Sequence, residues 1–99
     1  GVNLKIKVST RSVLDVQLLT STSAGYTITP ELQEGEFILS ATCSARNTSN
    51  QYSNNALPSG EISSISPTQV DVYYIRQSND GNATCVTSII IGKLELVKT

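Results

Sequence analysis

The sequence predicts a small all-β domain, and three observations support this prediction. Alternations of apolar and polar residues with period two recur along the 99 residues, which is the pattern of strands that bury one face. No stretch of helix length shows an apolar period of 3.6 residues. Polar segments rich in Ser, Asn, Gly and Pro separate the alternating runs, as turns and loops do. The length fits a single domain, residues 1–99, with one modest core.

The first strand is expected at the N-terminus. Val2, Leu4, Ile6 and Val8 alternate with polar residues, which places the four apolar side chains on one face. Two interpretations of residues 1–9 are open. The segment is either an ordinary first strand, whose lysines discourage aggregation at the sheet edge, or a donor strand that completes the sheet of another subunit by β-strand addition.

A second alternating run follows at residues 13–19. Leu14, Val16 and Leu18 alternate with Asp15 and Gln17. A short amphipathic helix also fits this spacing, but the flanks rich in Ser and Thr and the β-branched residues favour a strand.

The third and fourth strands are expected on either side of an acidic turn. The third runs through Tyr26 and Ile28 and ends at Pro30. Residues 31–36, with three Glu and one Gly, are typical of a turn. The fourth strand presents one apolar face, made of Phe37, Leu39, Ala41 and Cys43.

Residues 44–68 are expected to form a long polar loop with at most one short strand. Connections of this length are uncommon unless they bind something or are disordered. The loop offers donors, acceptors and an aromatic ring that suit a glycan or a protein epitope. The candidate ligand-binding residues are Arg46, Asn50, Gln51, Tyr52, Asn54 and Asn55. The other interpretation is a surface loop without a ligand.

The last two strands are expected to form a hairpin. Residues 69–77 alternate so that Val70, Val72 and Tyr74 share one face, and Asp80-Gly81 is a strong turn signal. The return strand has one apolar face made of Cys85, Thr87, Ile89 and Ile91. Beyond Gly92 the apolar residues Leu94 and Leu96 fall on the other parity, which predicts a β-bulge or a bend at the glycine.

Six or seven short strands in this order predict a small antiparallel β-sandwich of Ig-like kind, with a small partly open β-barrel as the alternative. Cys43 and Cys85 are expected to form one disulfide, worth about 4 kcal/mol in the chain-entropy model. A paired cysteine count suits an oxidising compartment, either the periplasm or the cell exterior. The alternative is two buried thiols in a cytosolic protein.

The composition argues against most catalysis. The chain has no His, which excludes the usual proton carrier and the common nucleophile–histidine pairs. Neither the ligand set of a zinc site nor the spacing of a calcium loop is present. We therefore expect no enzyme, no cofactor and no metal site. The carboxylates of residues 31–36 are more typical of a solvated turn than of an acid–base pair.

The charge and hydropathy exclude two classes of partner. The net charge is −1, so there is no basic surface for nucleic acid. The longest aliphatic stretch, at residues 89–91, is too short to span a bilayer. Two sequons, at Asn47 and Asn82, would be glycan acceptors in a secreted eukaryotic protein.

Two segments near the N-terminus resemble a known family. The segment NLKIKVS at residues 3–9, followed by VLDVQLL at residues 13–19, is similar to the start of chaperone–usher fimbrial subunits. The resemblance implies an incomplete Ig-like sandwich in which a donor segment of one subunit fills the groove of the next. The groove-filling residues would be Val2, Leu4, Ile6 and Val8.

The first functional hypothesis is therefore a non-enzymatic structural or adhesive subunit of a bacterial surface fibre, assembled by β-strand exchange. Its partners would be other subunits, together with a host glycan or receptor if it is adhesive. One alternative is a secreted glycan- or protein-binding module, similar to a lectin or to the binding subunit of a toxin, that uses the loop at residues 44–68. Another is the globular head of a type IV pilin or pseudopilin.

Overall fold

The computed structural model describes residues 3–47, 57–76 and 82–99. This part of the chain is all-β, as predicted, and forms six strands with no helix. The strands are β1 (Leu4–Leu19), β2 (Ser23–Ile28), β3 (Glu36–Asn47), β4 (Ser59–Ile65), β5 (Val70–Ile75) and β6 (Ala83–Lys98).

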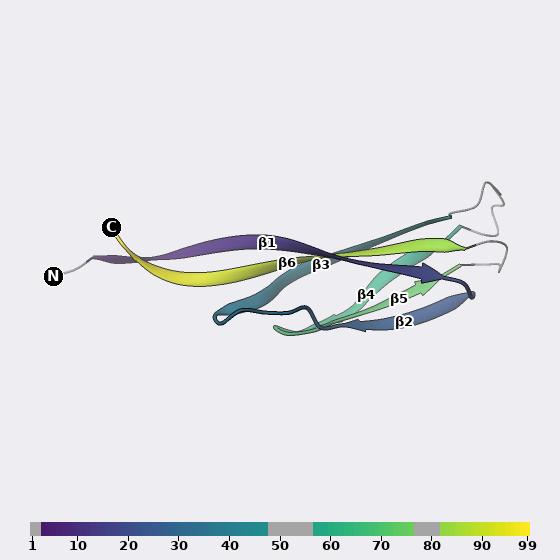
Figure 1. Ribbon diagram of the computed structural model, residues 1–99, viewed down its shortest axis with the longest axis horizontal. Coiled ribbons are helices and arrows are strands. Elements are labelled where there is room, and N and C mark those ends of the chain that lie inside the picture. The colour runs from purple at the N-terminus through teal and green to yellow at the C-terminus, as the bar shows by residue number, and fades with distance from the viewer. Residues whose placement is uncertain (1–2, 48–56, 77–81) are drawn as a thin grey trace.

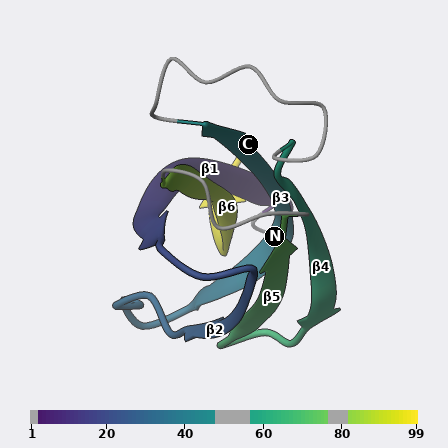
Figure 2. The ribbon, with the colours of Figure 1, turned by 90° about the vertical axis from the view of Figure 1, so that its right-hand side faces the viewer.

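The strands form two antiparallel sheets of three strands each. Sheet A has the order β1-β6-β3, and sheet B has the order β2-β5-β4. Figure 1 labels the strands, and Figure 2, which looks along the long axis, shows the two sheets curving around a common interior. The two ladders are separate, so the architecture is a sandwich and not the barrel alternative.

The strand order matches most of an Ig sandwich. In that fold one sheet contains strands B, E and D in this order, and the other contains C, F and G. Here β2-β5-β4 corresponds to B-E-D, and β3 and β6 correspond to C and F. β1 lies antiparallel to β6 on the side away from β3. The first strand of this chain therefore occupies the place that strand G has in a complete Ig sandwich.

The core lies between the inner faces of the two sheets. Val70, Val72 and Tyr74 of β5 are fully buried, as are Ile89 and Ile91 of β6, so the predicted inward faces of these two strands are confirmed. The hydroxyl oxygen of Tyr74 lies 2.8 Å from Thr87 Oγ1 and links the two sheets by a hydrogen bond. Burial raises the pKa of Tyr74 to about 12, so the phenol stays protonated.

The bulge expected at Gly92 lies instead on the neighbouring strand. β6 pairs with β1 without a break across Gly92, which lies opposite Thr10. The register of β3 slips between Ile38 and Ser40. The extra residue, Leu39, reaches to within 2.7 Å of the position that a Cβ atom of Gly92 would occupy. The glycine thus makes room for a side chain of β3, and the ladder of its own strand with β1 stays unbroken.

The β3 bulge also changes the predicted apolar face of that strand. Ile38 is buried at 5% exposure, whereas Leu39 is 45% exposed. Beyond the bulge, Ala41 and Cys43 face inward, opposite Ile89 and Thr87. The prediction that Leu39 shares a face with Ala41 and Cys43 is therefore wrong, because one inserted residue reverses the parity of a strand.

The predicted connections agree in part with the structure. Gly35 has a φ of 83° and sits in the turn before β3, where a residue without a Cβ is favoured. Of the expected loop at residues 44–68, residues 44–47 belong to β3, residues 59–65 form β4, and residues 48–56 lie outside the described residues. The predicted Asp80-Gly81 turn lies outside the described residues.

The expected disulfide is not formed in this structure, and both cysteines are free thiols. Cys43 and Cys85 do lie on the inner faces of adjacent strands. However, Cys43 is opposite Thr87, and Cys85 is opposite Ala45. Such diagonal neighbours are about 7–8 Å apart, whereas a disulfide requires Cα atoms about 4.4–6.8 Å apart. The predicted disulfide depended on the register between β3 and β6, which the alternation within a single strand does not define.

Candidate assembly interface

β1 and β6 continue past the sandwich as a two-stranded ribbon, formed by residues 4–9 and 93–98. Leu4 pairs with Lys98, and Ser9 pairs with Lys93. β3 begins to pair with β6 only at Lys93, so beyond that point no other described strand flanks the ribbon. In Figure 1 the ribbon extends away from the other strands and carries both termini at its tip, and the molecule measures 66 × 20 × 17 Å. Unpaired strand edges of this kind can accept or donate a strand.

One face of the ribbon is apolar and exposed. Ile6 pairs with Leu96 and Val8 pairs with Leu94, which aligns these side chains across the two strands. Leu4 lies on the same face, and the five side chains are 51–69% exposed. A shallow pocket of about 210 Å³ is lined by Ile6, Leu94, Glu95 and Leu96. Of the residues expected to act in strand exchange, the structure places Leu4, Ile6 and Val8 here, and Val2 lies outside the described residues.

Beyond the ribbon, residues 13–19 of β1 lie over the interior of the sandwich with a face that is half polar. Val13, Asp15, Gln17 and Leu19 face inward, and only Leu19 is fully buried. Gln17 Nε2 donates a hydrogen bond of 3.1 Å to Asp15 Oδ2. In this part of β1 the strand is therefore held mainly by its backbone ladder with β6, by Leu19 and, in part, by Val13.

The apolar residues that identified the strand at residues 13–19 face the solvent. Leu14, Val16 and Leu18 are between 54% and 64% exposed. The alternation correctly predicted a strand, but it placed three large aliphatic side chains on the outer face of sheet A. An antiparallel sheet with one solvated face normally places polar residues there.

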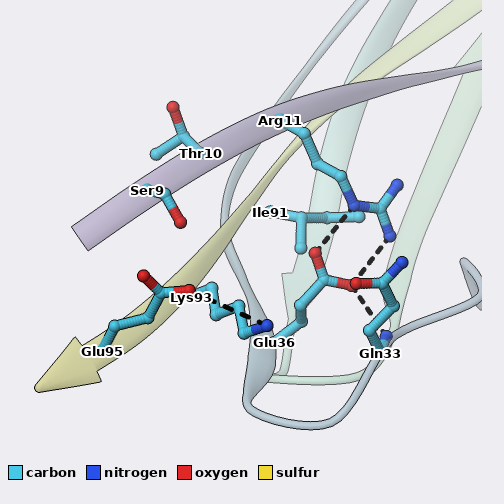
Figure 3. A pocket seen from close by; sticks show the side chains of 8 residues that line it. All are labelled: Ser9, Thr10, Arg11, Gln33, Glu36, Ile91, Lys93 and Glu95. Atoms are coloured by element: carbon cyan, nitrogen blue, oxygen red, sulfur yellow. Dashed lines mark hydrogen bonds and ion pairs between the residues drawn. The ribbon is translucent and has the colours of Figure 1, made fainter. Parts of the chain in front are cut away.

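A bidentate ion pair fixes the base of the ribbon, as Figure 3 shows. Arg11 Nε donates to Glu36 Oε2 at 2.8 Å, and its Nη2 donates to Glu36 Oε1 at 3.0 Å and to the carbonyl of Glu31 at 2.9 Å. The backbone amide of Gln33 adds a hydrogen bond of 2.7 Å to Glu36 Oε1. These contacts connect β1 to the turn between β2 and β3.

Arg11, Gln33 and Glu36 also line a polar pocket of about 280 Å³ between β1, β6 and the β2–β3 turn. The hydrogen bonds from Arg11 and Gln33 lower the pKa of Glu36 to about 2. A carboxylate that stays ionised and fully paired near neutral pH is a poor general base. The arrangement therefore positions the ribbon and is not suited to acid–base chemistry. The sequence carried no signal for it, because Arg11 and Glu36 are 25 residues apart.

The predicted ligand-binding loop lies almost entirely outside the described residues. Asn50, Tyr52, Asn54 and Asn55 are not described. Arg46 is exposed near the end of β3, opposite Thr84. This end of sheet A is opposite to the ribbon, so the structure does not bring Arg46 together with the apolar ribbon residues.

The two sequons lie at the same end as Arg46. Asn47 is the last residue of β3 and pairs with Ala83, and Asn82 is exposed just before β6. Burial raises the pKa values of Cys43 and Cys85, which keeps these thiols protonated and weakly nucleophilic.

Within the described ranges, no group of three or more His, Cys, Asp or Glu side chains is placed to hold a metal ion. The same part of the chain contains no helix that could cross a bilayer.

Sequence reasoning missed Leu94 and Leu96 as partners of the N-terminal segment. The available signal was their parity, because the apolar residues of β6 change from odd to even positions at Gly92. A change of parity without a bulge means that the apolar face of the strand changes sides, and this happens where β6 leaves the core. A comparison with protein-family models, with curated proteins and with solved structures finds no match to this chain.

Proposed function

We propose that this protein is a non-enzymatic structural subunit of a bacterial surface fibre and that its subunits join by exchange of β1. The observation that carries the proposal is the position of β1. It stands in the place of strand G of an Ig sandwich, yet it precedes all other strands in the chain. β1 is an edge strand of sheet A, and an edge strand can leave its own sheet and be replaced by the same strand of another copy without rearrangement of the strands that remain.

The packing of β1 supports exchange. Its inward face contributes Leu19 fully and Val13 partly to the core, and the two residues between them on that face, Asp15 and Gln17, are polar. An exchanged β1 would form the same ladder and the same contacts with the next subunit, so the free energies of the closed and exchanged states differ little. Domain swapping of an identical element is a low-cost route to association for this reason.

Exchange of β1 would generate open-ended assemblies. Each subunit donates one strand and accepts another, and these two actions use different surfaces of the molecule. Such head-to-tail contacts give filaments unless the rotation between subunits closes a ring. The ribbon would then join neighbouring subunits, with β1 of one copy paired to β6 of the next. The proposal does not depend on a disulfide.

Cross-linking between two cysteine variants tests strand exchange. Lys7 and Glu95 are directly paired in the ribbon, at a spacing that suits a disulfide. Lys7→Cys and Glu95→Cys chains would be mixed, unfolded in urea, refolded together and mildly oxidised. We expect covalent heterodimers in which residue 7 of one chain is linked to residue 95 of the other, identified by mass spectrometry without reductant.

A matched mixture provides the control. Glu61 lies on β4 in the other sheet, so a mixture of Lys7→Cys with Glu61→Cys should give no heterodimer above background. If the first mixture also gives none at concentrations where the chain associates, β1 stays within its own sheet and the strand-exchange proposal is wrong.

A further inference from the structure

The outer face of sheet A carries many exposed apolar side chains among small polar ones. Outer-facing positions are the even-numbered residues of β1 and β6, because their odd-numbered neighbours face the core. Leu39 of the β3 bulge joins them over Gly92. Nine large aliphatic side chains of this face are 45–69% exposed: Leu4, Ile6, Val8, Leu14, Val16, Leu18, Leu39, Leu94 and Leu96.

This face carries almost no charge. In β1 the charged residues are Lys5, Lys7, Arg11 and Asp15, all at odd positions that face the other way. In β6, Lys93 and Glu95 also have odd parity. Among the outer-facing positions of the three strands, only Arg46 and Lys98 are charged, and they lie at opposite ends of the sheet. A neutral face does not repel a second copy of itself, whereas a charged one would.

The exposed apolar area is large enough for a stable interface. At roughly 100 Å² for each half-exposed aliphatic side chain, the nine residues present on the order of 900 Å². Each partner in an interface of standard size contributes about 800 Å².

We propose that this outer face packs against the same face of a second copy, in a two-fold symmetric dimer. Two antiparallel sheets with apolar faces pack about 10 Å apart with interdigitating side chains. A self-complementary surface of this kind needs no other partner. The inference is independent of strand exchange, because the outer face is the same whether β1 comes from its own chain or from a neighbour.

The test uses a full chain in which strand exchange is blocked. A Lys7→Cys/Glu95→Cys double variant, oxidised within one chain, locks β1 to its own β6. We expect this strand-locked protein to form a reversible dimer in sedimentation equilibrium. Adding Val16→Lys, near the middle of the sandwich part of the face, should weaken the dimer at least about tenfold, since apolar burial is lost and a charge would be desolvated.

The matched control is Ile75→Lys, which places the same charge on the outer face of sheet B, where Ile75 is 47% exposed. It should leave the dimerisation constant unchanged. Leu14→Lys is a second variant of the sheet A face, for use if Val16→Lys does not give a native far-ultraviolet circular dichroism spectrum.

Three results would overturn the inference. The first is a strand-locked protein that stays monomeric at concentrations where the unlocked chain associates. The second is a dimer that Val16→Lys and Leu14→Lys leave intact. The third is a monomer that binds phosphatidylcholine vesicles through this face, which would make lipid its occupant. Each result concerns the locked protein and is therefore separate from the heterodimer test of strand exchange.

Discussion

At the scale of single residues, Glu36 has the most clearly defined role. Its side chain is only 6% exposed although it is ionised, and Arg11 and the amide of Gln33 satisfy both of its oxygens. The pair joins β1 to the β2–β3 turn at the point where β1 leaves the sandwich. A buried carboxylate of this kind links the stability of the fold to pH.

Because the pKa of Glu36 is lowered in the folded state, we expect the protein to lose stability at acidic pH. Its pKa falls from an ordinary value of 4.5 to about 2 in the folded state. Ionised Glu36 therefore stabilises the fold fully above pH 4.5, and this contribution is lost as the pH falls through about 2. We expect Glu36→Gln to lower the urea midpoint at pH 7 and to flatten its decrease between pH 4.5 and 2. Glu34→Gln, in the same turn, should leave both unchanged, and an unaltered pH slope in Glu36→Gln would contradict the prediction.

At the scale of the elements, the sequence was sufficient to predict most strands but not the sides they bury. Period-two alternation defines which residues of a strand share a face. Which of the two faces is covered depends on the partner sheet. In β5 the face with three apolar residues, Val70, Val72 and Tyr74, is buried. At residues 13–19 of β1, by contrast, the face with Leu14, Val16 and Leu18 is exposed, and the inner face includes Asp15 and Gln17.

The remaining differences also arise from contacts between distant segments. The bulge at Leu39 exists because Gly92, 53 residues later, leaves space for it. The two cysteines face the same interior but are offset by two residues in register. The sequence predicted only the N-terminal strand of the ribbon clearly, because the parity change of Leu94 and Leu96 was interpreted as a β-bulge or a bend at Gly92. The parity change at Gly92 was the one local signal for the ribbon, whereas the bulge and the offset of the cysteines have none.

The pairing of β4 with β5 depends on Gly60, which faces Tyr74. A Cβ atom at this position would lie 2.5 Å from Tyr74 Cε1 and 3.1 Å from Cys43 Sγ. Because the Tyr74 ring is fully buried and hydrogen-bonded to Thr87, it cannot swing away. We expect Gly60→Ala to cost about 1–3 kcal/mol of unfolding free energy, measured by urea denaturation.

Gly25 on the other edge of sheet B is the matched position for this experiment. Its added Cβ would meet the half-exposed ring of Tyr73 at 3.4 Å, an ordinary contact. Gly25→Ala should therefore be close to neutral. Equal effects at the two glycines would mean that Tyr74 is not packed as the structure shows.

At the scale of the whole molecule, the shape is unusual for a chain of this length. The radius of gyration is 17.8 Å, whereas a compact domain of about 100 residues has a value near 13 Å. The ribbon accounts for the difference, because it extends two strands into solvent with an apolar face exposed. An elongated, partly apolar chain of this kind is better suited to assembly than to isolation.

The two proposed interfaces predict four distinct assembly states. Strand exchange is head-to-tail and open-ended, whereas the outer face of sheet A is two-fold and closes on itself. The unmodified chain should therefore form paired filaments, and Val16→Lys alone should form single filaments. The strand-locked protein should stop at dimers, and the strand-locked protein with Val16→Lys should be a monomer.

Sedimentation velocity and small-angle scattering distinguish these states. The monomer should have a radius of gyration near the 17.8 Å of the isolated chain. If filaments persist in the strand-locked protein, their growth uses neither exchange of β1 nor a single two-fold contact, and the combined scheme is wrong. If Val16→Lys in the unlocked chain abolishes filaments altogether, the outer face supports the longitudinal contact itself. In that case the two surfaces act as one interface, continuous from Leu4 to Leu18 along β1.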